Sequence, residues 1–263
     1  MTFQAATPAP EVVADDHRFA AWLAQEAGRR LLEVRTEGLE GKALKDAGDR
    51  AAHELLMELL ATHRPDDAVL SEEALENAAD KDARLRARRV WIVDPLDGTR
   101  EFSEPPRDDW AVHVALWQDG ELVAGAVAQP ALGETFNTGT PPVVPPRTSD
   151  RPRIAVSRTR PPAFVEALAA ELDAELVPMG SAGVKMMSVV RDVADAYVHA
   201  GGQYEWDSAA PVAVARAAGL FTSRVDGSEL VYNQADVYLP DLVVCRPELS
   251  EKILAFIAAN GTD

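Results

Sequence analysis

Cysteine, basic residues and long apolar runs are scarce in this chain, and each scarcity excludes a class of protein. Cys245 is the single cysteine among 263 residues, so an internal disulfide cannot form. Lys and Arg number 26 against 43 Asp and Glu, and the formal net charge of −17 would repel nucleic acid polymers and anionic membranes. No stretch approaches the roughly 18 uncharged apolar residues that a membrane-spanning helix requires. We therefore expect a globular protein whose partner is neither a nucleic acid polymer nor a membrane.

The remaining composition is that of an ordinary folded protein. Hydrophobic residues make up 47% and charged residues 26% of the chain, which excludes a mostly disordered protein. The N-terminal segment has neither the basic start nor the apolar core of a signal peptide, so we expect a cytoplasmic protein. Cys245 ends the apolar run 242–245, which predicts a buried strand residue rather than a reactive thiol.

Apolar periodicity predicts helices and strands. Helices are predicted near residues 15–34 and 49–63, with acidic residues at the start of the first. Residues 119–120 are Asp-Gly between two apolar runs, which is typical of a β-hairpin. Prolines cluster in 141–152 and predict a linker between two halves, 1–140 and 153–263. Strands and helices alternate after this linker, and such alternation favours α/β layering.

Acidic residues stand where predicted strands end and where a predicted helix begins. They are Glu72, Asp94, Asp97 and Asp207. Asp94 and Asp97 share a stiff turn with a proline and a glycine, and two ionised carboxylates held close together are unfavourable without a cation. Mg²⁺ prefers carboxylate and carbonyl oxygens, whereas the five histidines are scattered and disfavour zinc. The sequence therefore predicts a site for a hard divalent cation, although Asp207 alone also fits a helix N-cap.

Three segments together resemble the inositol monophosphatase superfamily of Mg²⁺-dependent, lithium-sensitive phosphatases. They are Ser-Glu-Glu at 71–73, Trp-Ile-Val-Asp-Pro-Leu-Asp-Gly-Thr at 91–99 and Trp-Asp-Ser-Ala-Ala-Pro at 206–211. Their order and separation are similar to the family's over about residues 15–259. The resemblance implies an α/β (α+β) fold, a layered α-β-α-β-α sandwich. It also implies a metal site carried mostly by the N-terminal half, substrate contacts from the C-terminal half, and a homodimer.

The resemblance assigns roles to residues by their position in the motifs. The implied metal ligands, for two to three Mg²⁺ ions, are Glu72, Asp94, the Leu96 carbonyl, Asp97 and Asp207. The implied catalytic residues are Glu72, Thr99 and Asp49. A metal-activated water would attack phosphorus, Thr99 would orient this water, and Asp49 would be the partner of Thr99. Asp49 also fits the N-cap of the helix predicted to start there, and it can serve in both ways.

The residues after the glycine resemble one branch of the superfamily. Thr-Arg-Glu-Phe at 99–102 is similar to the segment of CysQ-type 3′(2′),5′-bisphosphate nucleotidases. This likeness implies a small phosphorylated substrate, adenosine 3′,5′-bisphosphate or its sulfated form, which loses its 3′-phosphate in sulfate assimilation. The alternative within the superfamily is an inositol-1-phosphate or fructose-1,6-bisphosphate phosphatase.

The same resemblance names the residues that would contact the substrate. They are Asp97, Gly98, Thr99, Ser157, Arg158, Gly180, Ser181, Lys185 and Asp207. Candidates for holding the second phosphate are Arg158, Arg160 and Lys185. Tyr204 and Tyr232 are each able to stack on a base or to pack in the core.

Overall fold

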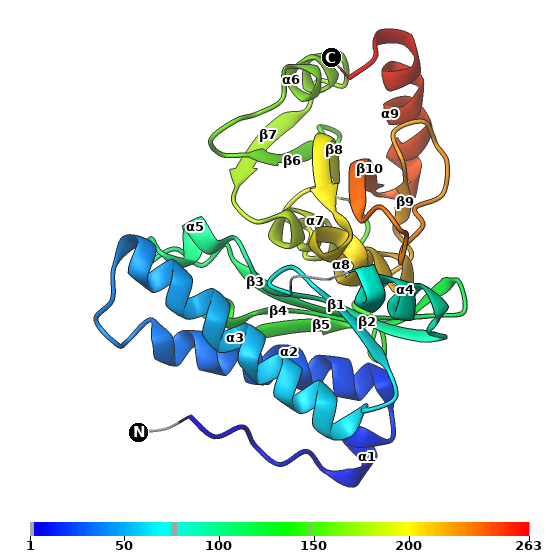
Figure 1. The fold of residues 1–263 in the computed structure, drawn as a ribbon. Helices are drawn as coiled ribbons and strands as arrows, with labels where there is room; N and C mark the ends of the chain where they lie inside the picture. Colours follow the sequence, from blue (N-terminus) through cyan, green and yellow to red (C-terminus); the bar gives the residue numbers. More distant parts are fainter. Residues whose placement is uncertain (1–2, 75–77, 148, 263) are drawn as a thin grey trace.

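A computed structural model describes residues 3–74, 78–147 and 149–262 of the chain (Figure 1). The helices are α1 (Pro10–Val13), α2 (Asp16–Val34), α3 (Gly41–His63), α4 (Ala78–Arg86), α5 (Thr99–Phe102), η1 (Pro130–Leu132), α6 (Ala163–Glu171), α7 (Ala182–Val190), α8 (Glu205–Ala217) and α9 (Pro247–Asn260). The strands are β1 (Ala68–Ser71), β2 (Arg89–Asp97), β3 (Ala111–Gln118), β4 (Glu121–Gln129), β5 (Glu134–Asn137), β6 (Arg153–Ser157), β7 (Glu175–Met179), β8 (Ala196–Tyr204), β9 (Phe221–Ser223) and β10 (Tyr238–Cys245).

The described strands form two five-stranded sheets. The first has the order β1-β2-β3-β4-β5, in which β1 runs parallel to β2 and the other neighbours are antiparallel. The second has the order β7-β6-β8-β10-β9, with β7, β6 and β8 parallel and the remaining pairs antiparallel. β1 and β2 therefore end at the same edge of the first sheet, and both ends carry acidic residues.

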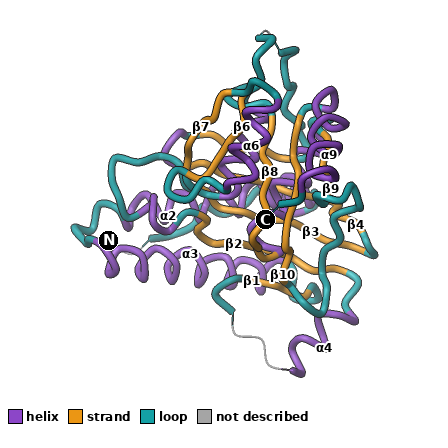
Figure 2. Tube along the Cα trace, turned by 90° about the horizontal axis from the view of Figure 1, so that it is seen from above, coloured by secondary structure: helices purple, strands orange, loops and turns teal. Residues whose placement is uncertain are grey.

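The helices and sheets stack in five layers (Figure 1). α2 and α3 cover the outer face of the first sheet, α7 and α8 lie between the sheets, and α6 and α9 cover the outer face of the second. Three buried apolar clusters fill the spaces between these layers. The view from above shows α3 and α9 on different sides of the molecule (Figure 2). The expected α-β-α-β-α sandwich is confirmed.

The first long helix begins as predicted, whereas the second begins earlier than predicted. The Asp15 carboxylate accepts hydrogen bonds from the backbone N–H groups of His17 and Arg18 and caps α2. α3 starts at Gly41, so Asp49 lies inside the helix, and the prediction that Asp49 is its N-cap is wrong. Gly48 lies within α3, and a larger residue is excluded there because a Cβ would lie 2.6 Å from the Phe102 ring. Packing against this ring thus favours a helix where the local sequence does not.

The predicted hairpin and buried cysteine are confirmed. Asp119 and Gly120 both have positive φ angles and join β3 to β4. Cys245 is fully buried in β10. Each described helix is too short or too polar to serve as a membrane span.

The proline-rich segment 141–152, of which Thr148 lies outside the described residues, connects β5 to β6. The Pro145 carbonyl accepts a hydrogen bond from Arg246, and Pro152 is buried, so the segment packs against the fold. The central apolar cluster contains Ile92 from the first half and Val212 from the second. The division into two halves remains a prediction, since this core joins them.

Candidate metal centre and active site

The end of β2 presents two carboxylates from one turn. Asp94 Oδ1 accepts a hydrogen bond from the Leu96 backbone N–H at 3.0 Å, and the pairing of β2 with β3 shifts between Asp94 and Asp97. Gly98 follows with φ 87°, and a Cβ there would lie 3.1 Å from Ser181 Cβ and 3.2 Å from the carbonyl oxygen of Asp109. A glycine is therefore required at this position. Asp94 and Asp97 are buried, with 1% and 7% of their surface exposed.

Asp97 is held ionised by donors at the start of α7. The Ser181 hydroxyl and the Gly183 N–H donate to its Oδ2, the latter at 2.6 Å, and the Ala182 N–H donates to its Oδ1 at 3.1 Å. His113 Nε2 lies 3.2 Å from Oδ2. Burial raises the pKa of a carboxyl, but these donors outweigh it and lower the pKa of Asp97 to about 2.

Asp207 joins this group from the first turn of α8. Its Oδ2 accepts a hydrogen bond from the Tyr204 N–H at 2.6 Å, so Tyr204 is the N-cap and Asp207 reaches back from the third helical position. Asp207 is therefore not the N-cap: its carboxylate accepts from the backbone N–H of the N-cap residue. Burial and then the Asp97 charge raise the pKa of Asp207 to about 6.

Glu72, at the end of β1, completes the cluster. Its charge acts on Asp94, the buried carboxyl at the end of the neighbouring strand β2. Loss of hydration and then the negative charge of Asp207 raise the pKa of Glu72 to about 7. Burial and then the Glu72 charge raise the pKa of Asp94. The charges of the four acidic residues predicted from strand ends and a helix start therefore act on one another.

This donor set fits a hard divalent cation. Carboxylate oxygens of Asp94 and Asp97 lie within 4.8 Å of each other and of the His113 ring beside them. The Leu96 carbonyl adds a neutral oxygen at the same turn, and carboxylate and carbonyl oxygens are the ligands that Mg²⁺ prefers. Binding a cation would relieve the repulsion that raises the pKa values of Glu72, Asp94 and Asp207.

The structure also brings the predicted Thr99–Asp49 pair together. Thr99 Oγ1 lies 3.2 Å from the Leu96 carbonyl oxygen and 3.4 Å from Asp49 Oδ1, so its proton has two acceptors. Burial and then the charge of Glu73 raise the pKa of Asp49 to about 7. Asp49 thus belongs to the interior of α3 and lies beside the turn that carries the metal-binding candidates.

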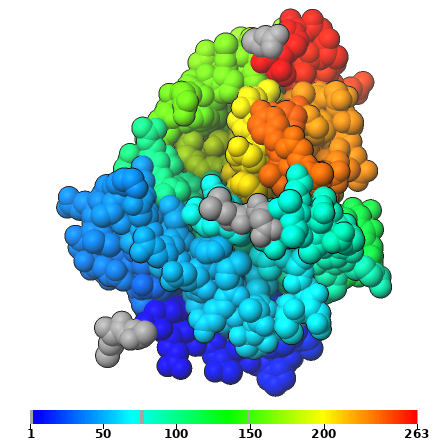
Figure 3. Space-filling model, in the orientation of Figure 1, coloured from blue at the N-terminus to red at the C-terminus, as the bar shows by residue number. Residues whose placement is uncertain are grey.

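A pocket of about 450 Å³ opens beside the acidic cluster. Its lining residues are Val156, Ser157, Arg160, Pro162, Lys185, Tyr197, Val198, His199, Ala200, Gly201, Gly202 and Gln203. Lys185 is buried at its inner end, where Nζ donates to the Ser181 carbonyl at 2.7 Å and lies 5.3 Å from the Tyr197 ring centroid. Ser181 therefore contacts both Lys185 and Asp97. Figure 3 shows the surface hollowed where the segments of α5, α7 and β8 meet.

The described lining residues of this pocket include no Asp or Glu, although the chain contains 43 of them. Two basic side chains, Arg160 and Lys185, do line it. The acidic cluster and this cationic pocket adjoin each other, which is the arrangement expected of a site that binds a phosphorylated molecule together with metal ions.

Comparisons with known proteins agree with this geometry. A sequence profile described as the inositol monophosphatase family matches residues 13–260. The chain belongs to the inositol monophosphatase family. This family is metal-dependent, in keeping with the acidic cluster.

Relatives of this family member have more specific names. The chain is 51% identical over 246 residues to a 3′-phosphoadenosine 5′-phosphate phosphatase of Mycobacterium bovis, covering 89% of this chain and 90% of the relative. It is 31% identical over 234 residues to the 3′(2′),5′-bisphosphate nucleotidase CysQ of Escherichia coli, covering 82% and 94%. The crystal structure of CysQ from Bacteroides thetaiotaomicron has a TM-score of 0.76 at 27% identity, covering 87% of this chain and 96% of that one.

Arg158, a predicted substrate contact, faces acidic partners instead of the pocket. Its Nε donates to Glu101 Oε1 at 2.8 Å, and its terminal nitrogen donates to Glu104 Oε2 at 2.8 Å. Glu101 in turn packs against Gly180, where a Cβ would lie 2.3 Å from the Glu101 carboxyl carbon. The Gly180 N–H donates to Asp109 at 2.7 Å. Arg158 therefore contacts Glu101, which packs against Gly180, the residue that precedes Ser181.

The two tyrosines proposed for stacking on a base have different surroundings. Tyr232 is buried, and its hydroxyl oxygen lies 3.1 Å from the Ser208 hydroxyl oxygen, so it packs in the core. Tyr204 is exposed and stacks on Trp206, with ring centroids 4.9 Å apart.

His113 is the functional candidate that the sequence reasoning missed. Its side chain is fully buried between Asp97 and the Trp206 carbonyl, which lies 3.1 Å from Nδ1. Burial alone would lower the pKa of His113, but the Asp97 carboxylate outweighs burial and raises it. The available signal was a polar residue within the apolar run 110–117, because buried polar groups require partners.

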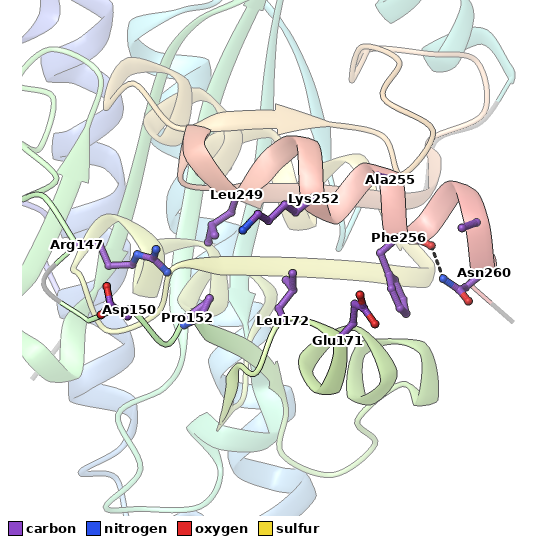
Figure 4. Close-up of a pocket in the computed structure, with 11 residues that line it drawn as sticks. Arg147, Asp150, Pro152, Glu171, Leu172, Leu249, Lys252, Ala255, Phe256 and Asn260 are labelled. Atoms are coloured by element: carbon purple, nitrogen blue, oxygen red, sulfur yellow. Dashed lines mark hydrogen bonds between the residues drawn. The ribbon is translucent and has the colours of Figure 1, made fainter.

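A larger hollow of about 660 Å³ lies elsewhere, between α6 and α9 (Figure 4). Arg147 and Lys252 line it together with Leu172 and Phe256, and the Asn260 side chain donates to the Phe256 carbonyl. This hollow lies on the outer side of the second sheet, whereas Lys185 of the smaller pocket contacts Ser181, which in turn contacts Asp97.

Proposed function

We propose that this chain is a Mg²⁺-dependent phosphatase that removes the 3′-phosphate of adenosine 3′,5′-bisphosphate, and of its sulfated form, in sulfate assimilation. The observation that carries the proposal is the pocket without acidic lining residues, whose Lys185 contacts Ser181, which in turn contacts the Asp97 carboxylate. The names of the relatives at 51% identity support the same substrate.

Two to three Mg²⁺ ions would be held by the carboxylates of the cluster and one carbonyl. These ligands are Glu72, Asp94, Leu96, Asp97 and Asp207. When bound, such ions lower the pKa of water, neutralise phosphate charge and stabilise the departing alkoxide. The Thr99 hydroxyl, within reach of Asp49, would orient the attacking water and pass its own proton toward that carboxylate. Glu72 would face the same water.

The turns around the centre would hold the substrate. Asp97, Gly98, Thr99, Gly180, Ser181 and Asp207 would surround the phosphate that leaves. Lys185 and Arg160 would attract the second phosphate, with Ser157 beside them in the pocket lining. Arg158 would reach the substrate only by giving up its ion pairs with Glu101 and Glu104.

The test is phosphate release measured side by side from adenosine 3′,5′-bisphosphate, inositol-1-phosphate and fructose-1,6-bisphosphate in Mg²⁺. We expect the nucleotide to be preferred by at least about tenfold in kcat/KM, which is about 1.4 kcal/mol, and adenosine 5′-phosphate to be the product. Preference for a sugar or inositol phosphate would refute the substrate assignment and leave the metal centre standing.

Two matched variants connect this activity to the cluster. Asp97→Asn removes a proposed ligand and should abolish nearly all turnover. Asp173→Asn makes the same chemical change at an exposed aspartate and should leave turnover unchanged. Equal activity in the two variants would contradict the ligand assignment. Location in the cytoplasm and a homodimeric assembly also remain predictions, which cell fractionation and light scattering can test.

A further inference from the structure

His113 lies between two parts of the metal centre that distant segments supply. β2 carries Asp94 and Asp97, whereas Asp207 belongs to α8, more than a hundred residues later in the chain. His113 is on β3, in register with Asp94, and its ring contacts both parts. Nε2 lies 3.2 Å from Asp97 Oδ2, and Nδ1 lies 3.1 Å from the backbone carbonyl of Trp206, the residue before Asp207.

A rigid ring with a polar atom on each side sets the separation of the two groups that it touches. His113 is 0% exposed, so water does not replace either contact. Nδ1 makes a hydrogen bond with the Trp206 carbonyl, whereas Nε2 makes none and meets Asp97 as an ion-pair contact. Gly183 leaves the room for this ring, because a Cβ there would lie 2.0 Å from Nε2. The same Gly183 donates its N–H to Asp97, so the ring and the start of α7 approach one carboxylate together.

We infer that His113 is a positioning residue that fixes the distance between the Asp97 and Asp207 carboxylates, and hence the shape of the cation site that they share. The inference rests on the proposed metal-dependent function. Removal of a side chain that orients a metal ligand typically lowers metal affinity or activity by about 10- to 100-fold. His113 would act through Asp97 and the Trp206 backbone, without touching the substrate.

The test is direct binding of Mn²⁺, a stand-in for Mg²⁺, to the full chain by calorimetry in the absence of substrate. His113→Ala should weaken the affinity of at least one Mn²⁺ ion by tenfold or more. Its kcat for adenosine 3′,5′-bisphosphate should fall at saturating substrate, while KM changes little. His113→Gln, whose amide can reach toward Asp97, should recover part of the affinity and serves if the alanine variant does not fold.

Val114→Ala is the matched control on the same strand. Val114 is fully buried but belongs to the apolar cluster on the other face of the sheet, so this variant loses stability without touching the metal centre. It should bind Mn²⁺ as the unmodified protein does. Unchanged Mn²⁺ binding in both His113 variants would overturn the inference while the proposed function stands. Failure of the unmodified protein to bind Mn²⁺ or to hydrolyse the nucleotide would instead overturn the proposed function.

Discussion

Asp207→Asn is expected to stabilise the metal-free protein and to remove most of its activity. The asparagine keeps an oxygen that can accept the hydrogen bond from the Tyr204 N–H, so the start of α8 is preserved. The substitution removes one negative charge from a site where Asp97 already carries one. Loss of a metal ligand should lower turnover by more than about 100-fold.

The magnitude follows from the pKa of Asp207, which rises from 3.8 to about 6 in the folded protein. The folded state therefore holds this proton more tightly than the unfolded state, and stability falls as pH rises from about 4 through about 6. Two pH units correspond to at most about 3 kcal/mol, and neighbouring carboxyls share the effect. We expect the variant to gain about 1–3 kcal/mol above pH 6, which is a Tm higher by roughly 2–6 °C.

The assay is thermal unfolding in a chelator at pH 7.5 and pH 4, followed by the same scan with Mg²⁺. The gain should be present at pH 7.5 and nearly absent at pH 4. Mg²⁺ should then stabilise the unmodified protein more than the variant, by about 2.7 kcal/mol for one site at a hundred times its Kd. A variant that melts at or below the temperature of the unmodified protein in chelator at pH 7.5 would refute the electrostatic reasoning.

Three further outcomes are expected. The Mg²⁺ concentration for half-maximal activity should fall between pH 6 and pH 8, because Glu72, with a pKa of about 7, must lose its proton to bind a cation; a pH-independent value would contradict this ligand role. Arg158→Ala should lower kcat alike for adenosine 3′,5′-bisphosphate and adenosine 3′-phosphate, because Arg158 pairs with Glu101; a KM increase confined to the bisphosphate would contradict this and indicate direct contact with the second phosphate. Cys245, buried with a pKa raised to about 12, should resist thiol reagents until the protein unfolds, and rapid labelling of the native protein would place it at the surface.

Local patterns were sufficient to predict most elements of the fold. The spacing of Phe19, Leu23 and Leu31 places one face of α2 in the core, and Asp15 marks its start. The start of α3 could not be predicted in this way, because its first turns contain two glycines and are supported by Phe102, far away in sequence. A strand such as β9 is not visible in local patterns, because it is only three residues long and pairs with β10 alone.

The candidate site shows the same division between local and distant information. Asp94 and Asp97 could be recognised because their motif contains its own turn chemistry. His113 was overlooked because its partners, Asp97 and Trp206, meet it only in the folded chain. Arg158 was visible as a cation, but its pairing with Glu101 depends on contact between the two halves.

The most direct test of the central claim is a crystal structure grown with Mn²⁺ and adenosine 5′-phosphate, with anomalous scattering used to locate the metal. We expect anomalous peaks bounded by the carboxylates of Asp94, Asp97 and Asp207, with the nucleotide phosphate toward Lys185. Peaks only elsewhere on the protein, with no metal among these carboxylates at saturating Mn²⁺, would contradict the assignment of this cluster as the catalytic metal centre.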